Sequence, residues 1–203
     1  VLIRLNALSR AFEQEFNNYG VPYRVFGGFK FYERKEIKDI IAYLRLIVNP
    51  FDSESLLRII NFPKRGIGDS SINLIKETAA RHNLSVYEIV INASKYGLPL
   101  ALIKKCQQFK DIAINLMQYS QDLDMQNFIV KLLEVTGLNN AYNEDTEENY
   151  NRRLNIDEFV NSFIEYFSVN KDADLSNYLT SVNLVSDIDS MDDSGVTLAP
   201  IHS

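Results

Sequence analysis

Apolar residues recur at helical spacing through most of the chain, from about residue 33 to residue 180. The clearest stripe consists of Ile37, Ile40, Ile41, Leu44 and Ile47, and Asn49-Pro50 follows it. Positions three and four apart share one face of a helix, so this pattern predicts helices that each bury one side. It predicts further helices at 53–61, 69–82, 85–93, 98–120, 125–136, 154–169 and 174–185, while the polar, acidic stretch 143–151 predicts an exposed loop or a frayed helix end.

The two ends of the chain have a different pattern. Residues 1–5 are a β-branched and aliphatic run that predicts a strand, and residues 22–26 predict a second short strand after a predicted helix at 9–19, which Gly20 ends. An acidic loop at 186–195 precedes a last predicted strand at 196–201. The predicted fold class is therefore mainly α: a helical subdomain inserted into a partial α/β domain whose strands lie at both chain ends.

Composition excludes several classes of protein. The chain has 203 residues, of which 46% are hydrophobic and 24% charged, as in ordinary globular proteins. No apolar run approaches the ~20 residues of a membrane-spanning helix. One cysteine, Cys106, and two histidines leave no disulfide framework and little for a metal site. We therefore expect a reducing, cytoplasmic location, no membrane partner and no metal ligands in this chain.

The charge is divided unequally along the sequence. Residues 1–110 carry 17 Lys and Arg against 10 Asp and Glu, whereas residues 111–203 carry 4 against 17. A polyanion-binding face would accordingly belong to the first part of the chain. The acidic helices of the second part could equally be simple solvated surfaces, and the charge division alone does not decide between these interpretations.

The sharpest local motif is the run Phe62-Pro63-Lys64-Arg65-Gly66-Ile67-Gly68-Asp69-Ser70-Ser71. Two glycines allow a close backbone approach to a phosphate, and the helix predicted to follow points its free N–H groups at the turn. Ile67 would anchor the turn in the core, Lys64 and Arg65 would attract the anion, and Asp69 would cap the helix. The motif is typical of a hairpin that holds a nucleic-acid backbone without reading bases, and an ordinary tight turn is the alternative.

Two other features are weaker. Aromatic residues alternate with cations from Gly27 to Asp39, which is compatible with base stacking, but a domain junction with packed aromatics is the favoured interpretation. Asn6, Ser9 and Arg10 follow the first strand and His202 follows the last, at ends of parallel strands where α/β domains bind ligands. A lone histidine such as His202 is more often only a surface residue.

Several motifs of catalytic sites do not occur in the sequence. It has no G-x-x-x-x-G-K-[ST] phosphate-binding loop and no Ser, His and Asp order that a hydrolase would need. The acidic clusters at 144–148 and 187–193 lack the spacing of a calcium-binding loop, so we interpret them as solvated loops. No catalytic residue is predicted in this chain.

Five ordered blocks of sequence resemble superfamily 1 DNA helicases of the UvrD/Rep/PcrA type. They lie at 3–10, 21–28, 31–39, 42–47 and 63–68, and residues 196–203 resemble the start of that family's motif V. The sequence has Ala199-Pro200 where most relatives have Met-Thr, and a proline there removes a backbone donor from a central strand. The resemblance covers the whole chain.

The resemblance implies a division into three parts. Residues 1–30 would be the first part of a RecA-like domain called 2A, residues 31–190 an inserted helical subdomain called 2B, and residues 191–203 a returning strand of 2A. The implied duplex-binding residues are Lys64, Arg65, Gly66, Ile67, Gly68, Ser70 and Ser71. The implied single-strand-binding residues are Asn6, Ser9, Arg10 and His202, and Gly27 and Gly28 would form a hinge.

The function implied by the resemblance is that of a duplex-binding, regulatory module of an ATP-dependent 3′-to-5′ DNA helicase in DNA repair or replication. The parent would use ATP and Mg²⁺ and act at junctions of single-stranded and duplex DNA, while the chain alone, with no ATP site, would be inactive. Protein partners could bind through the helical subdomain. The alternative is a protein-interaction module of a helicase-like subunit that has no ATPase activity of its own.

Overall fold

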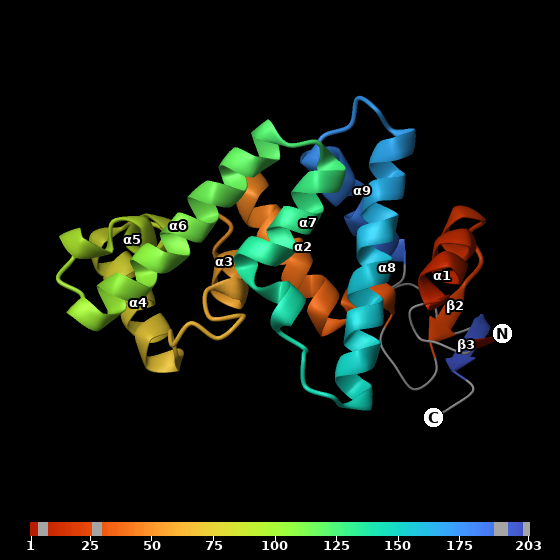
Figure 1. The fold of residues 1–203 in the computed structure, drawn as a ribbon, viewed down its shortest axis with the longest axis horizontal. Coiled ribbons are helices and arrows are strands. Elements are labelled where there is room, and N and C mark those ends of the chain that lie inside the picture. The colour runs from red at the N-terminus through yellow and green to blue at the C-terminus, as the bar shows by residue number, and fades with distance from the viewer. Residues whose placement is uncertain (4–7, 26–29, 189–194, 201–203) are drawn as a thin grey trace. The chain divides into compact units, whose positions relative to one another are not determined.

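The structure is a computed structural model that describes residues 1–3, 8–25, 30–188 and 195–200. The expectations for Asn6, Gly27, Gly28 and His202 lie outside the described residues. Helices dominate the described chain, and the predicted mainly α class is confirmed. The α-helices are α1 (Ser9–Asn18), α2 (Lys35–Val48), α3 (Ser53–Ile59), α4 (Asp69–His82), α5 (Val86–Ile91), α6 (Leu100–Asp122), α7 (Met125–Thr136), α8 (Glu147–Val169) and α9 (Leu175–Ile188), joined by short 3₁₀ turns at Phe31–Glu33, Ala93–Lys95 and Leu138–Asn140 (Figure 1).

Local capping chemistry sets several helix ends. Ser85 begins α5 with a complete capping box, because its side chain accepts from the amide of Glu88 while the Glu88 carboxylate accepts from the amide of Ser85. Asp124 accepts a hydrogen bond from the amide of Asn127 at the start of α7. Gly137 ends α7 in the left-handed region, with φ of 80°, where glycine has no Cβ penalty.

The start of α8 differs from the prediction. The polar stretch 143–151 was expected to be a loop or a frayed end, yet α8 already begins at Glu147. Thr146 is the N-cap and its side chain accepts from the amide of Asn149 at 3.2 Å. Glu147 and Glu148 then lie in the first turn, where negative charge favours the helix dipole. Acidic residues therefore support this helix start, although apolar periodicity does not mark it.

The two ends of the chain form one small parallel sheet. Its strands are β1 (Leu2–Ile3), β2 (Tyr23–Val25) and β3 (Val196–Pro200), in the order β1-β3-β2. β3 therefore lies between the two strands of the predicted β-α-β segment, with Leu2 opposite Ala199 and Tyr23 opposite Val196. Pro200 occupies the last position of the central strand, opposite Ile3. A proline at a strand end interrupts less of the ladder than one in its middle.

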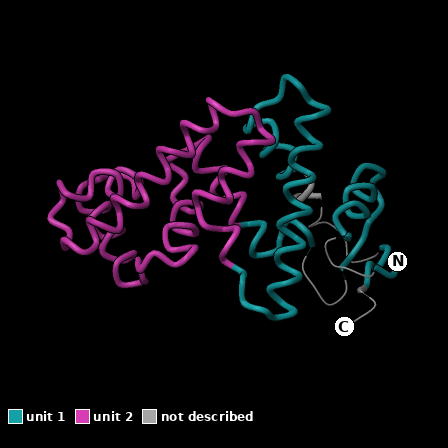
Figure 2. Tube along the Cα trace, in the orientation of Figure 1, with its two compact units in different colours: residues 1–38, 142–203 teal, residues 39–141 magenta. Residues whose placement is uncertain are grey.

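The chain divides into two compact units. Unit 1 contains residues 1–38 and 142–203, and unit 2 contains residues 39–141 (Figure 2). The core of unit 2 includes Tyr43, Leu56, Ile67, Phe109 and Phe128. This division by contacts is not the division at residues 30 and 190 implied by the resemblance, which stays a prediction.

Unit 1 has an aromatic core beside a polar one. Phe159, Phe163 and Tyr178 from α8 and α9 pack ring against ring, with centroids 4.8 to 6.4 Å apart. Nearby, the buried guanidinium of Arg34 donates to Asn155 of α8 at 2.8 Å and to Ser9 of α1 at 2.6 Å. These contacts join the first helix of the chain to the late helix α8 inside one unit.

Within the described ranges, no helix is both long and apolar enough to cross a membrane.

We predict that Gly195→Ala displaces β3 from β2. A Cβ at Gly195 would lie 1.9 Å from the carbonyl oxygen of Pro22, next to the hydrogen bond that the Val196 amide donates to that same oxygen. Forcing such a contact should lower the free energy of unfolding by about 1–3 kcal/mol. Urea unfolding and amide exchange should show the loss, with faster exchange in 196–198. Unchanged exchange in β3, or an equal change in α6 of unit 2, would contradict this assignment.

Candidate nucleic-acid interface

The motif at 62–71 folds into a tight turn between α3 and α4 in unit 2. The side-chain oxygen of Asn61 accepts from the amides of Arg65 and Ile67, both at 3.0 Å, and so draws the turn together. Gly66 has φ of +73°, a conformation that other residues rarely adopt. Ile67 is fully buried, which confirms that it anchors the turn in the core, and because Asn61 also takes its amide we remove Ile67 from the proposed duplex contacts.

The helix after the turn begins one residue differently from the prediction. Asp69 was expected to cap α4, but Gly68 is the N-cap and Asp69 is the first helical residue. The carbonyl of Gly68 accepts from the amide of Ile72 at 3.0 Å, which starts the helical ladder. The amides of Asp69, Ser70 and Ser71 have no intrahelical acceptor, and Gly68 has no side chain that could cap them. Because Ser70 is exposed and Ser71 half-buried, this array of donors lies at the surface.

Arg65 has a different role from the one predicted. It was expected to attract a phosphate, but its guanidinium points into unit 2 and donates four hydrogen bonds. The acceptors are the carbonyls of Ile59, Phe62 and Thr136 and the hydroxyl of Tyr43, at 2.8 to 3.0 Å. An arginine has five N–H donors, so four of them serve the fold. We therefore remove Arg65 from the proposed phosphate contacts and treat it as the residue that holds the turn.

Tyr43 completes this polar cluster. Its side chain is fully buried on α2, and its hydroxyl donates to the carbonyl of Phe62 at 2.7 Å while accepting from Arg65. Burial raises the pKa of Tyr43 to about 12, although the nearby Arg65 charge opposes the rise. The phenol therefore stays protonated near neutral pH and keeps its donor role. The sequence does not indicate the hydrogen-bonding role of Tyr43, because a tyrosine within an apolar helical segment predicts only core packing.

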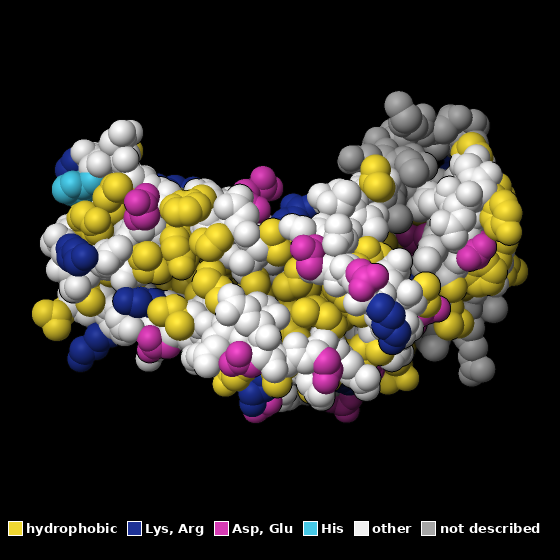
Figure 3. Space-filling model, turned by 90° about the horizontal axis from the view of Figure 1, so that it is seen from above, with side chains coloured by type: hydrophobic (Ala, Val, Ile, Leu, Met, Phe, Trp, Pro, Cys, Tyr) yellow, Lys and Arg dark blue, Asp and Glu magenta, His cyan; other side chains and the backbone are white. Residues whose placement is uncertain are grey.

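Two lysines lie at the turn. Lys64 is exposed, as a phosphate-attracting residue must be. Lys105 of α6, 39 residues further along the chain than Gly66, donates to the carbonyl of Gly66 at 2.5 Å. On the part of unit 2 visible in Figure 3, Lys and Arg side chains stand apart from one another among hydrophobic, acidic and uncharged ones. On the face drawn there, which is not the one that carries the turn, cations are thus placed singly rather than in one block.

The predicted single-strand contacts that the structure describes lie in unit 1. Ser9 is fully buried and its hydroxyl accepts from Arg34, so we remove Ser9 from the proposed DNA contacts. Arg10 donates to Glu158 at 2.5 Å and to Gln14 at 2.6 Å. Burial opposes the charged form of Arg10, but the hydrogen bond and charge of Glu158 outweigh it and raise the pKa of Arg10.

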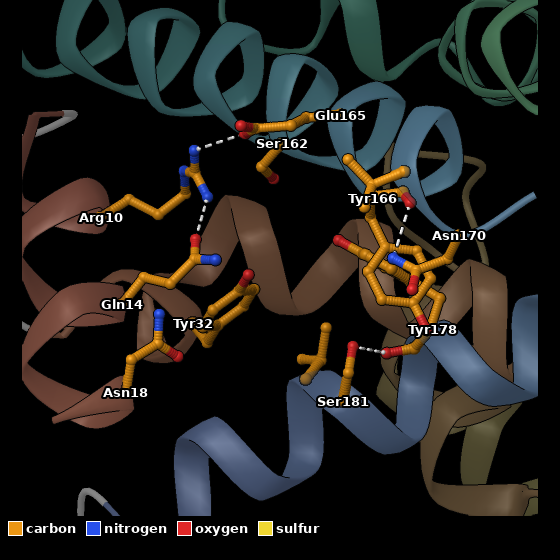
Figure 4. A pocket seen from close by; sticks show the side chains of 12 residues that line it. Arg10, Gln14, Asn18, Tyr32, Ser162, Glu165, Tyr166, Asn170, Tyr178 and Ser181 are labelled. Atoms are coloured by element: carbon orange, nitrogen blue, oxygen red, sulfur yellow. Dashed lines mark hydrogen bonds and ion pairs between the residues drawn. The ribbon is translucent and has the colours of Figure 1, made fainter. Parts of the chain in front are cut away.

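Arg10 lines a cavity of about 330 Å³ in unit 1. Figure 4 shows Arg10, Gln14 and Asn18 of α1 on one side of it, with Tyr166, Asn170, Tyr178 and Ser181 of α8 and α9 on the other. Burial raises the pKa of Tyr178 well above its ordinary value, so its hydroxyl is neutral. Arg10 is already paired with Glu158 and, at 3.5 Å, with Glu165. The cavity therefore has no net positive charge with which to attract DNA.

The alternating aromatic and basic segment before α2 belongs to the fold of unit 1. Phe31 is fully buried and its amide donates to the carboxylate of Glu13 at 2.9 Å. The Lys30 ammonium lies 4.7 Å from the centre of the Tyr23 ring. Burial lowers the pKa of Arg34, while the charges of Glu13 and Glu36 oppose that shift. These buried contacts support the interpretation of this segment as a packed junction rather than a base-stacking surface.

Comparison with known proteins identifies the family. The model of the UvrD-like helicase C-terminal domain matches residues 1–203. The chain belongs to this family. It is 38% identical, over its whole length, to the ATP-dependent DNA helicase PcrA of Staphylococcus aureus and to that of Staphylococcus epidermidis. It spans 28% of the length of these relatives.

We predict that Arg65→Met destabilises this UvrD-like domain far more than Lys64→Met. The two changes remove the same charge from adjacent residues, but only Arg65 holds four oxygens inside unit 2. Leaving four partly buried acceptors without this partner should lower the free energy of unfolding by about 2–4 kcal/mol, whereas the exposed Lys64 should change it by no more than about 0.5 kcal/mol. Urea unfolding followed by circular dichroism measures both. Equal destabilisation by the two variants would show that Arg65 does not hold the turn.

Proposed function

We propose that this chain is the duplex-binding, regulatory module of an ATP-dependent 3′-to-5′ DNA helicase that acts in DNA repair or replication. The observation that carries the proposal is the surface array of helix N-terminal amides behind the Gly66-Ile67-Gly68 turn. Membership of the UvrD-like helicase family and the likeness to PcrA helicases support it.

The turn would hold one phosphate of the duplex backbone. The amides of Ser70 and Ser71 and the positive end of the α4 dipole favour an anion, and Gly68 leaves room for its oxygens, while Gly66 provides the bend of the turn. A Cβ built at Gly68 meets no atom within 4 Å, so the space beside the helix start is open. Lys64 would add attraction from the solvent side. Such contacts bind any sequence, because they reach the backbone and not the base edges.

The wider assignment follows the family. We assign residues 1–30 and 191–203 to a RecA-like domain 2A and residues 31–190 to subdomain 2B, with rotation at Gly27 and Gly28. Asn6 and His202 are proposed to face the single strand, and Arg10 is left out because Glu158 and Glu165 already pair with its charge. Because the sequence contains no phosphate-binding loop, we assign ATP and Mg²⁺ to other parts of a cytoplasmic parent protein, and we expect the purified chain to hydrolyse no ATP with or without DNA. Hydrolysis that a substitution within this chain abolishes would contradict that assignment.

We predict that Gly68→Asp weakens duplex binding without harming the fold. Aspartate is a favoured N-cap, so its carboxylate should accept from the amides of α4 and repel a phosphate from the same site. Losing hydrogen bonds to a charged ligand costs about 1.5–3 kcal/mol, or about tenfold or more in affinity. Fluorescence anisotropy with labelled duplex and single-stranded DNA measures the effect, which should be confined to the duplex.

The control for this experiment is Gln126→Glu. It adds the same charge to the exposed first turn of α7, also in unit 2, and should leave duplex affinity nearly unchanged. Duplex affinity should also fall steeply with salt, because phosphate contacts release counterions. Equal duplex binding by the wild type and Gly68→Asp, with melting curves unimpaired, would remove the turn from the interface. If the chain instead binds a protein with an affinity that does not depend on salt, and does not bind duplex DNA, the alternative of a protein-interaction module is favoured.

A further inference from the structure

The cation nearest the Gly66-Ile67-Gly68 turn comes from a helix that the motif does not include. The motif supplies Lys64 and Arg65, but the guanidinium of Arg65 is turned inward onto four oxygens. Lys105 of α6 instead places its ammonium 2.5 Å from the carbonyl oxygen of Gly66. Of the cations at the turn, Arg65 therefore stabilises the fold, and Lys105 of α6 supplies a positive charge at the surface of the turn.

The packing of α6 fixes this position. Leu102, Cys106 and Phe109 are buried on one side of the helix, so Lys105 lies at the edge of the buried stripe and is half-exposed. Its side chain lies close over the turn: a Cβ built at Gly66 would be 3.0 Å from its Nζ and 3.2 Å from its Cε. The absence of a Cβ at Gly66 is thus needed both for the positive φ and for the approach of Lys105.

We propose that Lys105 is a further phosphate-contacting residue of the duplex site, an inference that rests on the proposed function. An ammonium has three donors, and the carbonyl of Gly66 takes one of them. The other donors can reach a ligand at the exposed side of the turn. The same ammonium offsets the partial negative charge of the Gly66 carbonyl, which would otherwise repel a phosphate oxygen approaching the amides of α4.

The proposal assigns the two basic residues separate tasks. Arg65 donates hydrogen bonds to oxygens within unit 2 and holds the backbone of the turn. Lys105 donates to the turn from its solvent side and places a positive charge there. Lys104, its neighbour in the sequence, is exposed and has no contact with the turn among the described interactions, so it offers a matched control on the same helix.

The experiment compares Lys105→Met with Lys104→Met in the 203-residue chain, using fluorescein-labelled duplex DNA of mixed sequence over a salt series. Each phosphate contact contributes about 0.9 to the slope of log affinity against log salt. We expect Lys105→Met to lower that slope by about 0.9 and to weaken duplex binding about tenfold at low salt. Lys104→Met should change both much less. Lys105→Gln, which keeps a polar group near Gly66 but removes the charge, should behave like Lys105→Met.

The possible outcomes separate this inference from the proposed function. If Gly68→Asp weakens duplex binding but Lys105→Met and Lys105→Gln match Lys104→Met in affinity and slope, the phosphate role of Lys105 is overturned and the duplex site stands. If Lys105→Met lowers stability while Lys105→Gln binds with the wild-type slope, Lys105 only fastens α6 to the turn, and the inference again fails. If Gly68→Asp has no effect, the duplex site itself is wrong, and the inference fails with it.

Discussion

The guanidinium of Arg65 holds together three parts of unit 2 that are distant in sequence. Its acceptors are the phenol of Tyr43 on α2 and carbonyls that follow α3 or end α7. Ile59 is the last residue of α3 and Thr136 the last of α7, so the positive charge lies at the negative ends of two helix dipoles. This half-buried cation is thus compensated by neutral oxygens: two helix-end carbonyls, the carbonyl of Phe62 after α3, and the phenol of Tyr43.

The surface of the turn follows from this internal bond. Once Arg65 and Asn61 fix the backbone from below, Ile67 enters the core and Gly66 and Gly68 are left outside. The site that results consists of backbone donors with few charges around it. Under the proposed function, such a site holds one phosphate at a time and is indifferent to base sequence. The chain also carries a net negative charge, which limits its nonspecific attraction to polyanions.

Unit 1 also uses an arginine to join distant segments, and there the arginine is buried. Arg34 joins Ser9 of α1 to Asn155 of α8, and Asn155 donates in turn to Glu36 at 2.6 Å. These bonds tie the first residues of the chain to a helix that begins more than a hundred residues later. The three-stranded sheet also joins the two ends of the chain, because β3 lies between β1 and β2. Each end of the chain therefore depends on the other for its place in the fold.

The sequence by itself determined the helices, several of their ends and the turn. Apolar periodicity located α2 and α4, Ser85 and Gly137 marked helix ends, and the two glycines around Ile67 identified the surface motif. These features are local: spacing, capping and backbone freedom act within a few residues.

Only the tertiary structure decided which cations serve the fold and which face solvent. Arg65 and Lys64 are adjacent and equally basic, yet one is bound inside by Tyr43 and Thr136 and the other is exposed. Lys105 reaches the turn because α6 packs there, and Ser9 is buried because Arg34 meets it. Hydrogen bonds between residues so distant in sequence leave no periodic signal, and the direction of a long side chain depends on the partners that the fold brings to it.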